Sequence, residues 1–300
     1  MSIGAEDFKA GSGKKVSLKD CDPGWMPNWA KKQGDKEGKK AVKQQAMAIL
    51  ESNRQKLVEM QELFWANSTY SMLIVLQGMD AAGKDGTIRH VMSGINPQGC
   101  QVTGFKAPSE EELLHDFLWR NYKALPEKGT IGIFNRSYYE DVLIVKVRPE
   151  VLQKEKLPSK LDGRQFWSER YEDINLFERH LVRNGTVVLK FFLNLSKKRQ
   201  KQRFLKRLGD PDKYWKFSFS DLSERGKWDD YMDAYEDMLN STSTDWAPWY
   251  VIPADKKWVS HLAISEILLS QIKNLDLKYP TLSEEQSQAL EKAKAELQKE

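Results

Sequence analysis

Short runs, most of them almost continuously apolar, alternate with longer amphipathic stretches along most of the chain. The runs lie at residues 72–77, 101–105, 130–134, 187–196 and 249–253. The continuous run at 72–77 is typical of a strand that is buried on both faces of a parallel sheet. Around them, apolar residues recur at helical spacing in the segments 39–67, 88–95, 109–126, 164–183 and 264–272. This alternation predicts a three-layer α/β/α fold with a central parallel sheet of about five strands.

Three segments differ from this alternation. Residues 1–38 are rich in Gly, Lys and Asp, which predicts an N-terminal extension, although Trp25 and Trp29 indicate that part of it packs. About fifty residues separate the last two strands, too many for a plain loop, so we expect a helical lid at about 197–245. Residues 281–300 are polar and helix-prone, which predicts a helical tail. The remainder, 39–280, forms one predicted domain that includes the lid.

The first predicted strand runs into the sequence GMDAAGKDGT, which has the spacing of a phosphate-binding loop. Gly78, Gly83 and Lys84 occupy the fixed positions of G-x-x-x-x-G-K, but Asp85 replaces the usual Ser or Thr that helps to hold magnesium. Backbone N–H groups in such a loop point at phosphate oxygens beside a helix N-terminus. The residues predicted to contact phosphate are Gly78, Ala81, Ala82, Gly83, Asp85, Gly86 and Thr87. An ordinary Gly-rich turn is the alternative interpretation.

Asp80 is an acid within this loop, where an anion would repel bound phosphate unless a cation lay between them. Magnesium prefers oxygen ligands and keeps several waters, so a carboxylate can replace the missing hydroxyl. Asp80 is therefore the candidate metal ligand. A turn or helix-capping carboxylate is the alternative role.

The third predicted strand ends in FNRSYYEDVL, where a second acidic motif is expected at the carboxyl edge of the sheet. Arg136 has the planar fork that clamps phosphate, and Asn135 and Glu140 emerge beside it. A salt bridge from Arg136 to Glu140 or Asp141 is the alternative. The ring of Tyr139 is a candidate to stack on a nucleotide base, although such rings are more often part of a core.

A basic run, KKRQKQRFLKR at 197–207, contains seven basic residues and no acid. It predicts a polyanion partner, with Arg199, Arg203 and Arg207 as phosphate ligands. Polyphosphate carries a repeating negative charge and no nucleotide bases, so a row of cationic side chains is sufficient to bind it. A solvated helix face is the alternative interpretation of any one of these residues.

The bulk composition excludes several other classes of protein. The net charge is only +4, from 47 basic and 43 acidic residues, so the whole chain does not indicate a nucleic-acid partner. No apolar run approaches the roughly 18 residues of a membrane span, and the first residues show no signal-peptide core. Cys21 and Cys100 are the only cysteines, which is typical of a cytoplasmic protein.

The motifs together resemble the family-2 polyphosphate kinases, a branch of the P-loop kinases related to thymidylate kinase. The resemblance covers about residues 40–275 and rests on four stretches: GMDAAGKDGT, FNRSYYEDVL, WKFSFSDLSERGKWDDYMDAYEDML and TSTDWAPWYVIPADKKW. It implies a P-loop kinase fold whose lid closes over the loop. It also implies phosphoryl transfer between inorganic polyphosphate and nucleotides with Mg2+.

The resemblance assigns a role to each matching residue. Asp80, Lys84 and Arg136 correspond to catalytic positions, and Asn135 stands where another branch has Asp, so it would share the metal with Asp80. Asn135, Tyr139 and Glu140 are the expected nucleotide-binding residues, and Glu140 is similar to the subclass that accepts AMP as well as ADP. The implied partners are polyphosphate and AMP, ADP and ATP, with guanine nucleotides as a further candidate. The implied assembly is a homodimer or homotetramer.

Two other functions agree with the same motifs. One is an ATP-dependent nucleoside monophosphate kinase of the thymidylate kinase type. The other is a non-catalytic polyanion-binding protein. Turnover that depends on polyphosphate distinguishes a polyphosphate kinase from the nucleoside monophosphate kinase. Polyanion binding without turnover identifies the non-catalytic protein.

Overall fold

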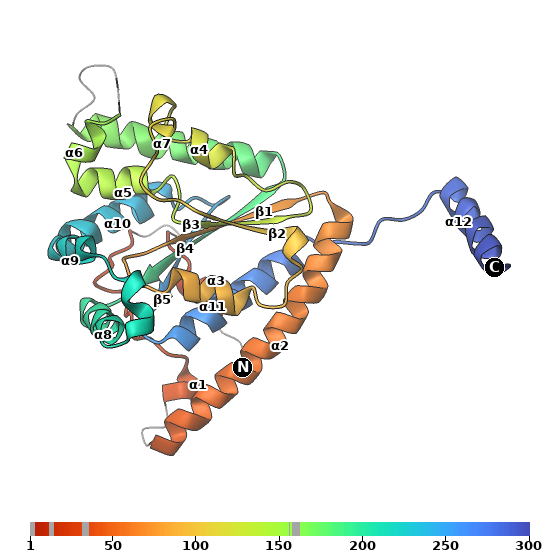
Figure 1. Cartoon of the computed structure of the whole chain (residues 1–300), viewed down its shortest axis with the longest axis horizontal. Coiled ribbons are helices and arrows are strands. Elements are labelled where there is room, and N and C mark those ends of the chain that lie inside the picture. Colours follow the sequence, from red (N-terminus) through yellow and green to blue (C-terminus); the bar gives the residue numbers. More distant parts are fainter. Residues whose placement is uncertain (1–3, 12–14, 32–35, 156, 158–162) are drawn as a thin grey trace.

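The fold is a five-stranded parallel sheet with helices on both faces, seen in a computed structural model that describes residues 4–11, 15–31, 36–155, 157 and 163–300 (Figure 1). The strands are β1 (Ser71–Gln77), β2 (Cys100–Gly104), β3 (Ile131–Asn135), β4 (Thr186–Asn194) and β5 (Trp249–Pro253). Their order across the sheet is β2-β3-β1-β4-β5, and every pairing is parallel. The predicted three-layer fold is confirmed.

The helices connect these strands in sequence. Their bounds are α1 (Asn28–Lys31), α2 (Lys36–Asn67), α3 (Lys84–Val91), α4 (Trp119–Tyr122), α5 (Glu140–Val147), α6 (Pro149–Leu152), α7 (Gly163–Arg183), α8 (Lys197–Leu208), α9 (Phe219–Gly226), α10 (Trp228–Thr242), α11 (Lys257–Lys273) and α12 (Glu284–Leu297). Short 3-10 helices are η1 (Ala5–Phe8), η2 (Pro97–Gly99), η3 (Glu112–Leu114) and η4 (Pro211–Lys216). The predicted lid segment therefore contains α8, η4, α9 and α10.

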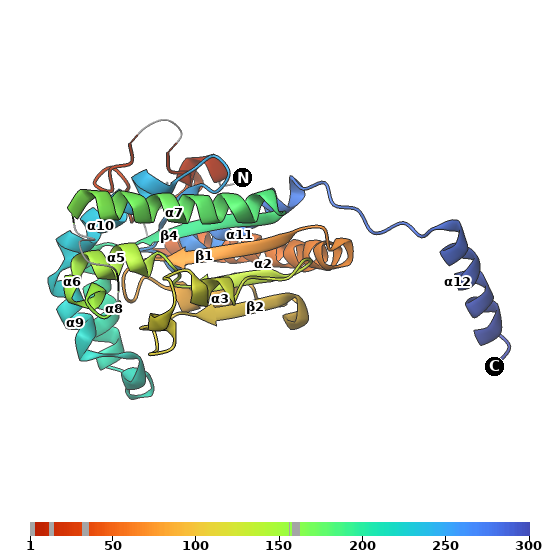
Figure 2. The same cartoon turned by 90° about the horizontal axis from the view of Figure 1, so that it is seen from above.

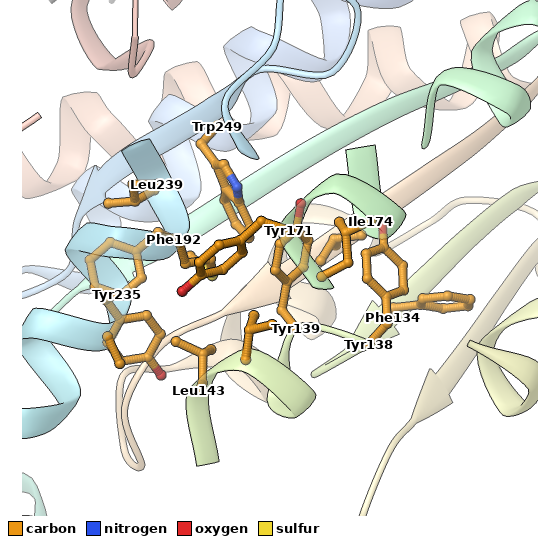
Figure 3. Close-up of a cluster of buried hydrophobic side chains, with 14 of the residues drawn as sticks. Phe134, Tyr138, Tyr139, Leu143, Tyr171, Ile174, Phe192, Tyr235, Leu239 and Trp249 are labelled. Carbon is orange, nitrogen blue, oxygen red and sulfur yellow. The ribbon is translucent and has the colours of Figure 1, made fainter. Parts of the chain in front are cut away.

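Strand β1 is the centre of the sheet, because all seven of its residues are buried and it pairs with both β3 and β4. Its side chains alternate between two cores. Met72, Ile74 and Leu76 face a core formed with α2, α3 and α11. Leu73 and Val75 face a second core formed with α5, α7 and α10 (Figures 2 and 3). We call these the α11-side core and the α7-side core.

The expected helix over residues 109–126 is wrong. Ser109 and Glu112 do form the predicted reciprocal cap, with Ser109 N donating to Glu112 Oε2 at 2.8 Å and Glu112 N donating to Ser109 Oγ at 3.2 Å. Only the single turns η3 and α4 follow, because His115 is extended and Asp116 Oδ1 accepts a hydrogen bond from Leu118 N. Leu114, placed in the predicted apolar stripe, is 72% exposed.

Part of the N-terminal extension packs against the body, as Trp25 and Trp29 indicate. The rings of Phe8 and Trp25 are 5.1 Å apart, and those of Trp29 and Trp258 are 5.9 Å apart. Lys9 forms an antiparallel bridge with Tyr250, so the extension borders the outer edge of β5. At the other end, α12 stands away from the body and its residues are exposed (Figures 1 and 2). Within the described part of the chain, no helix combines the length and apolarity that a membrane crossing requires.

Candidate phosphate-binding site

The candidate site lies where β1, β3 and β4 end, at one edge of the sheet. The loop 78–83 follows β1, the residues Asn135 and Arg136 come from the end of β3, and α8 begins shortly after β4. In an open parallel sheet, ligands bind outside the carboxyl ends of the strands. The fold therefore brings the three predicted motifs to one place.

The loop after β1 has the backbone of a phosphate-binding loop. Gly78, Ala81 and Gly83 all have positive φ, and Gly83 is the N-cap of α3. Gly78 also lies against β4, because a Cβ built on it would be 2.9 Å from the carbonyl oxygen of Leu193. Gly86 and Thr87 form the first turn of α3, where Thr87 N donates to Gly83 O. The loop thus directs its N–H groups and the helix N-terminus toward the same space.

Lys84 lies folded back over the loop. Its Nζ donates to the carbonyl oxygen of Gly78 at 2.6 Å, and the residue is only 8% exposed. Burial lowers the pKa of Lys84 and nearby Arg136 acts in the same direction, while the carboxylates of Asp80, Glu140 and Asp85 oppose them. A polyanion entering the loop would add negative charge beside this ammonium group.

Two polar contacts join the loop to the end of β3. Arg136 donates from Nη2 to Asp80 Oδ1 at 2.7 Å, and Asn135 donates from Nδ2 to Asp85 Oδ1 at 2.8 Å. Glu140 and, less strongly, Asp80 raise the pKa of Arg136, which therefore keeps its charge. Asp80 of the loop and Asp85 at the start of α3 thus both have partners. The ion pair that Arg136 forms is with Asp80, whereas the alternative interpretation of the sequence named Glu140 or Asp141.

The turn between β3 and α5 holds Arg136 in an unusual conformation. Its φ of 65° is in the left-handed region, and its N–H donates to the carbonyl oxygen of Leu76 at 3.1 Å. Below the turn, the amide of Gln77 lies between Ser137 Oγ, at 3.1 Å, and Glu140 Oε1, at 2.9 Å. The backbone after β3 is thereby attached to the end of β1.

Helix α8 is attached to the loop by its own side chains. Arg203 donates from Nη1 to the carbonyl oxygens of Ala81 and Ala82, both at 2.7 Å, and Gln200 donates to the carbonyl oxygen of Asp80 at 2.9 Å. Burial lowers the pKa of Arg203 to about 10, with smaller effects from Arg199 and Arg207. The basic helix therefore borders the loop 78–83.

Arg199 and Arg207 lie one helical turn to either side of Arg203, on the same face of α8. Arg199 donates to the carbonyl oxygen of Asp255 at 3.0 Å, and Arg207 donates to that of Lys216 at 3.2 Å. The three guanidinium groups form a row that leads away from the loop. This row is a candidate path for an extended polyanion.

Tyr139 does not lie with the other candidate residues. Its side chain is fully buried in the α7-side core, where its hydroxyl donates to Glu178 Oε1 at 2.7 Å (Figure 3). The ring therefore offers no surface on which a nucleotide base could stack. It occupies the position that the core interpretation of the sequence predicts.

Three residues that border the site were not predicted from the sequence. Gln200 holds the loop backbone, and it stands in the basic run without a charge that would mark it. Asp221 in α9 and Tyr235 in α10 both have pKa values raised by burial and, to a smaller degree, by the charge of Asp80. Their proximity depends on the path of the lid segment, which no local pattern specifies.

The oxygen donors present fit a hard cation such as magnesium. Asp80, Asp85 and Asn135 supply carboxylate and amide oxygens around the mouth of the loop. No group of three or more acidic, histidine or cysteine side chains that could hold a metal occurs in the described ranges. Magnesium does not require one, because it commonly binds through one or two carboxylates together with substrate phosphates and water.

Both the sequence and the fold of this chain are similar to those of known proteins. A family model described as Polyphosphate kinase 2 matches residues 39–280. The ADP-polyphosphate phosphotransferase of Rhodopseudomonas palustris is 47% identical over 281 residues, which cover 93% of this chain and 93% of that protein. The AMP/ADP-polyphosphate phosphotransferase of Meiothermus ruber is 47% identical over 244 residues, covering 81% and 86%. The crystal structure of polyphosphate kinase 2 from Arthrobacter aurescens TC1 has a TM-score of 0.83 at 39% identity, covering 96% of this chain and 98% of that one.

Replacing each of two glycines in this region by alanine should change the free energy of unfolding in opposite directions. Gly78→Ala places a Cβ at φ 149° and 2.9 Å from a backbone oxygen, so we expect it to lower the free energy of unfolding by about 1–3 kcal/mol. Gly86→Ala is the matched control, because nothing lies within 4 Å of its Cβ and alanine favours the helix by about 1 kcal/mol. Urea unfolding measures both. Equal stability of the two variants would contradict the conformation described for the loop.

Proposed function

Because the chain belongs to the polyphosphate kinase 2 family, we propose that it transfers phosphoryl groups between inorganic polyphosphate and AMP or ADP. The observation that carries this proposal is the meeting of Lys84, Arg136 and the arginine row of α8 at one sheet edge. Such a site binds two polyanions, one in the loop and one along the helix. The names of the relatives favour polyphosphate as the donor over ATP, so an ATP-dependent nucleotide kinase becomes an outcome of the test.

In this proposal the protein accelerates transfer by positioning and charge neutralisation. Lys84 and Arg136 hold the transferring phosphoryl group, and Arg199, Arg203 and Arg207 hold the polyphosphate chain. The second pKa of a terminal phosphate is about 6, so the acceptor oxygen is largely ionised at neutral pH and needs no strong general base. Arg136 has five N–H donors, so it can bind phosphate while it retains its bond to Asp80.

Asp80 and Asn135 are the residues proposed to hold Mg2+, with Asp85 beside them. The ion would shield the charge between the loop acids and the phosphates when it is bound. Without it, the carboxylate of Asp80 would repel the donor chain, because its negative charge lies inside the loop. This accounts for an acid at a position where phosphate-binding loops usually have none.

Other features of the proposal concern the whole protein. The segment 197–245 is the proposed lid, and residues 1–38 and 281–300 are the proposed extension and tail of the 39–280 domain. The proposed location is the cytoplasm, and the proposed assembly is a homodimer or homotetramer. Guanine nucleotides are proposed as additional acceptors beside AMP and ADP.

The first test compares two phosphate donors. Purified protein is incubated with AMP and Mg2+, with either polyphosphate or ATP as the donor, and the nucleotides are separated by chromatography. We expect ADP and then ATP to form with polyphosphate. Product with ATP as the only effective donor would identify a nucleotide kinase, and polyphosphate binding without any product would identify a non-catalytic protein.

Substitutions in the loop should stop transfer. Lys84→Ala removes the cation over the loop, and Asp80→Asn removes the proposed metal ligand and the partner of Arg136. We expect each to lower kcat by at least about 10²-fold, the usual effect of losing one group that stabilises the transition state. Lys273→Ala, at the exposed end of α11, is the control for a lost positive charge. Rates like those of the unaltered protein in either loop variant would exclude this mechanism.

Glu140→Asn tests the choice of acceptor. We expect kcat/KM for AMP to fall more than kcat/KM for ADP, because Glu140 lies beside Arg136 at the proposed acceptor position. Steady-state rates with both nucleotides at fixed polyphosphate give the ratio directly. An equal loss with AMP and ADP would remove Glu140 from acceptor selection.

A further inference from the structure

A buried ion pair lies behind the candidate site, in the α7-side core. Lys190 of β4 and Glu178 of α7 are both fully buried, and Lys190 Nζ donates to Glu178 Oε2 at 2.6 Å. The other oxygen of Glu178 accepts from two tyrosine hydroxyls, that of Tyr138 at 2.8 Å and that of Tyr139 at 2.7 Å. These tyrosines follow Arg136 and precede Glu140 in the chain, and they pack with Trp249 in this core (Figure 3).

Every donor of Lys190 has an acceptor. Beyond Glu178, its ammonium group donates to the hydroxyl oxygen of Tyr139 at 2.9 Å and to the carbonyl oxygen of Thr242 at 2.7 Å. The Thr242 hydroxyl in turn accepts from Trp249 Nε1 at 2.9 Å. The network thus joins the turn after β3 to α7, β4, the end of α10 and β5. It is closed and fully hydrogen-bonded, so it permits only one arrangement of its members.

Stability alone does not account for this network. Removing two charges from water costs several kcal/mol per ion, and apolar side chains of similar volume often stabilise a core equally well. Burial lowers the pKa of Lys190 against the opposing effect of Glu178, which reflects this cost. Phenylalanine in place of either tyrosine would keep the ring packing without a buried hydroxyl. A second role for such polar groups is to fix a conformation, as buried polar networks do in some proteins.

The conformation that needs fixing is the turn 136–140. Arg136 is a non-glycine residue at φ 65°, a region that costs about 1–3 kcal/mol and persists only where the surroundings impose it. On its inner side the turn is attached to Glu178 by Tyr138 and Tyr139. On its outer side it presents Arg136 to Asp80 and places Glu140 beside Gln77. The turn 136–140 therefore connects the buried ion pair to the candidate site.

We propose that Glu178 and Lys190 are positioning residues, which hold Tyr138 and Tyr139 and so direct Arg136 and Glu140 toward the phosphate-binding loop. The role is defined for the phosphoryl transfer proposed above and rests on it. Among the segments that form the site, the turn is the one that the network contacts directly. The loop itself is attached to α8 by Arg203 and Gln200, which are independent of the pair.

The test replaces the pair with neutral side chains of similar size. The double variant Glu178→Gln with Lys190→Met removes both charges together, so that no unpaired charge is left in the core. We expect it to remain folded, with kcat lowered by about 10- to 100-fold, since small misplacements of a reacting group have effects of this order. KM for polyphosphate should change much less than kcat. Ile267→Val, in the α11-side core, is the control for a change in core packing and should keep kcat.

A purely structural role would not predict coupling to Arg136. If the pair acts through that residue, the double variant should have little further effect on kcat in an Arg136→Ala background. Multiplicative losses in the combined variant would overturn the proposal. If the double variant fails to fold, Tyr139→Phe, which removes one hydroxyl and keeps the ion pair, is put through the same cycle with the same two outcomes.

Hydrogen exchange tests the inference without any turnover. Tyr139 N donates to Ser137 Oγ and Asp141 N donates to the carbonyl oxygen of Tyr138, so both amides should be protected in the native turn. In the variant we expect faster exchange at 137–142 and unchanged exchange at 84–91. Unchanged exchange in the turn would overturn the inference. A protein that makes no product from polyphosphate would overturn the proposed function instead, and this exchange experiment would still decide the role of the pair.

Discussion

The ion pair between Asp80 and Arg136 joins the two chain segments on which the site depends. One segment is the loop after β1, and the other is the turn after β3, and these strands are neighbours at the centre of the sheet. The parallel pairing brings Leu76 opposite Asn135, so the next residues of both strands emerge side by side. The strand order therefore determines the site, and the ion pair fixes the orientation of its two halves.

In this structure the cations of the site bind to the protein's own oxygens. Lys84 binds a carbonyl oxygen of the loop, Arg136 binds a carboxylate, and Arg203 binds two further carbonyl oxygens. Phosphate oxygens carry more charge than carbonyl oxygens, so a polyphosphate can replace the neutral partners at a gain in interaction energy. The cations of the site thus have oxygen partners within the protein, and a strongly charged ligand would still bind them more tightly than the carbonyl oxygens do.

The sheet and the loop could be predicted from the sequence because they depend on local patterns. The continuous apolar run of β1 predicts a strand buried on both faces, and glycines at fixed spacing predict the loop. The failed helix at 109–126 shows the limit, since its apolar spacing was right but Asp116 and His115 favour a turn. Tyr139 shows a second limit. Because Tyr139 lies within a motif, the sequence makes it a candidate nucleotide-binding residue. Its burial depends on Glu178 and Lys190, which are distant from it in the sequence.

The sheet separates the two cores, and each half of the site is built on a different one. Helix α3, which extends the phosphate-binding loop, packs into the α11-side core, whereas the turn that bears Arg136 and Glu140 packs into the α7-side core. A substitution deep in one core changes mainly the half of the site above it. The loop and the turn are therefore supported by different sets of side chains, so each can acquire substitutions without repacking the core beneath the other.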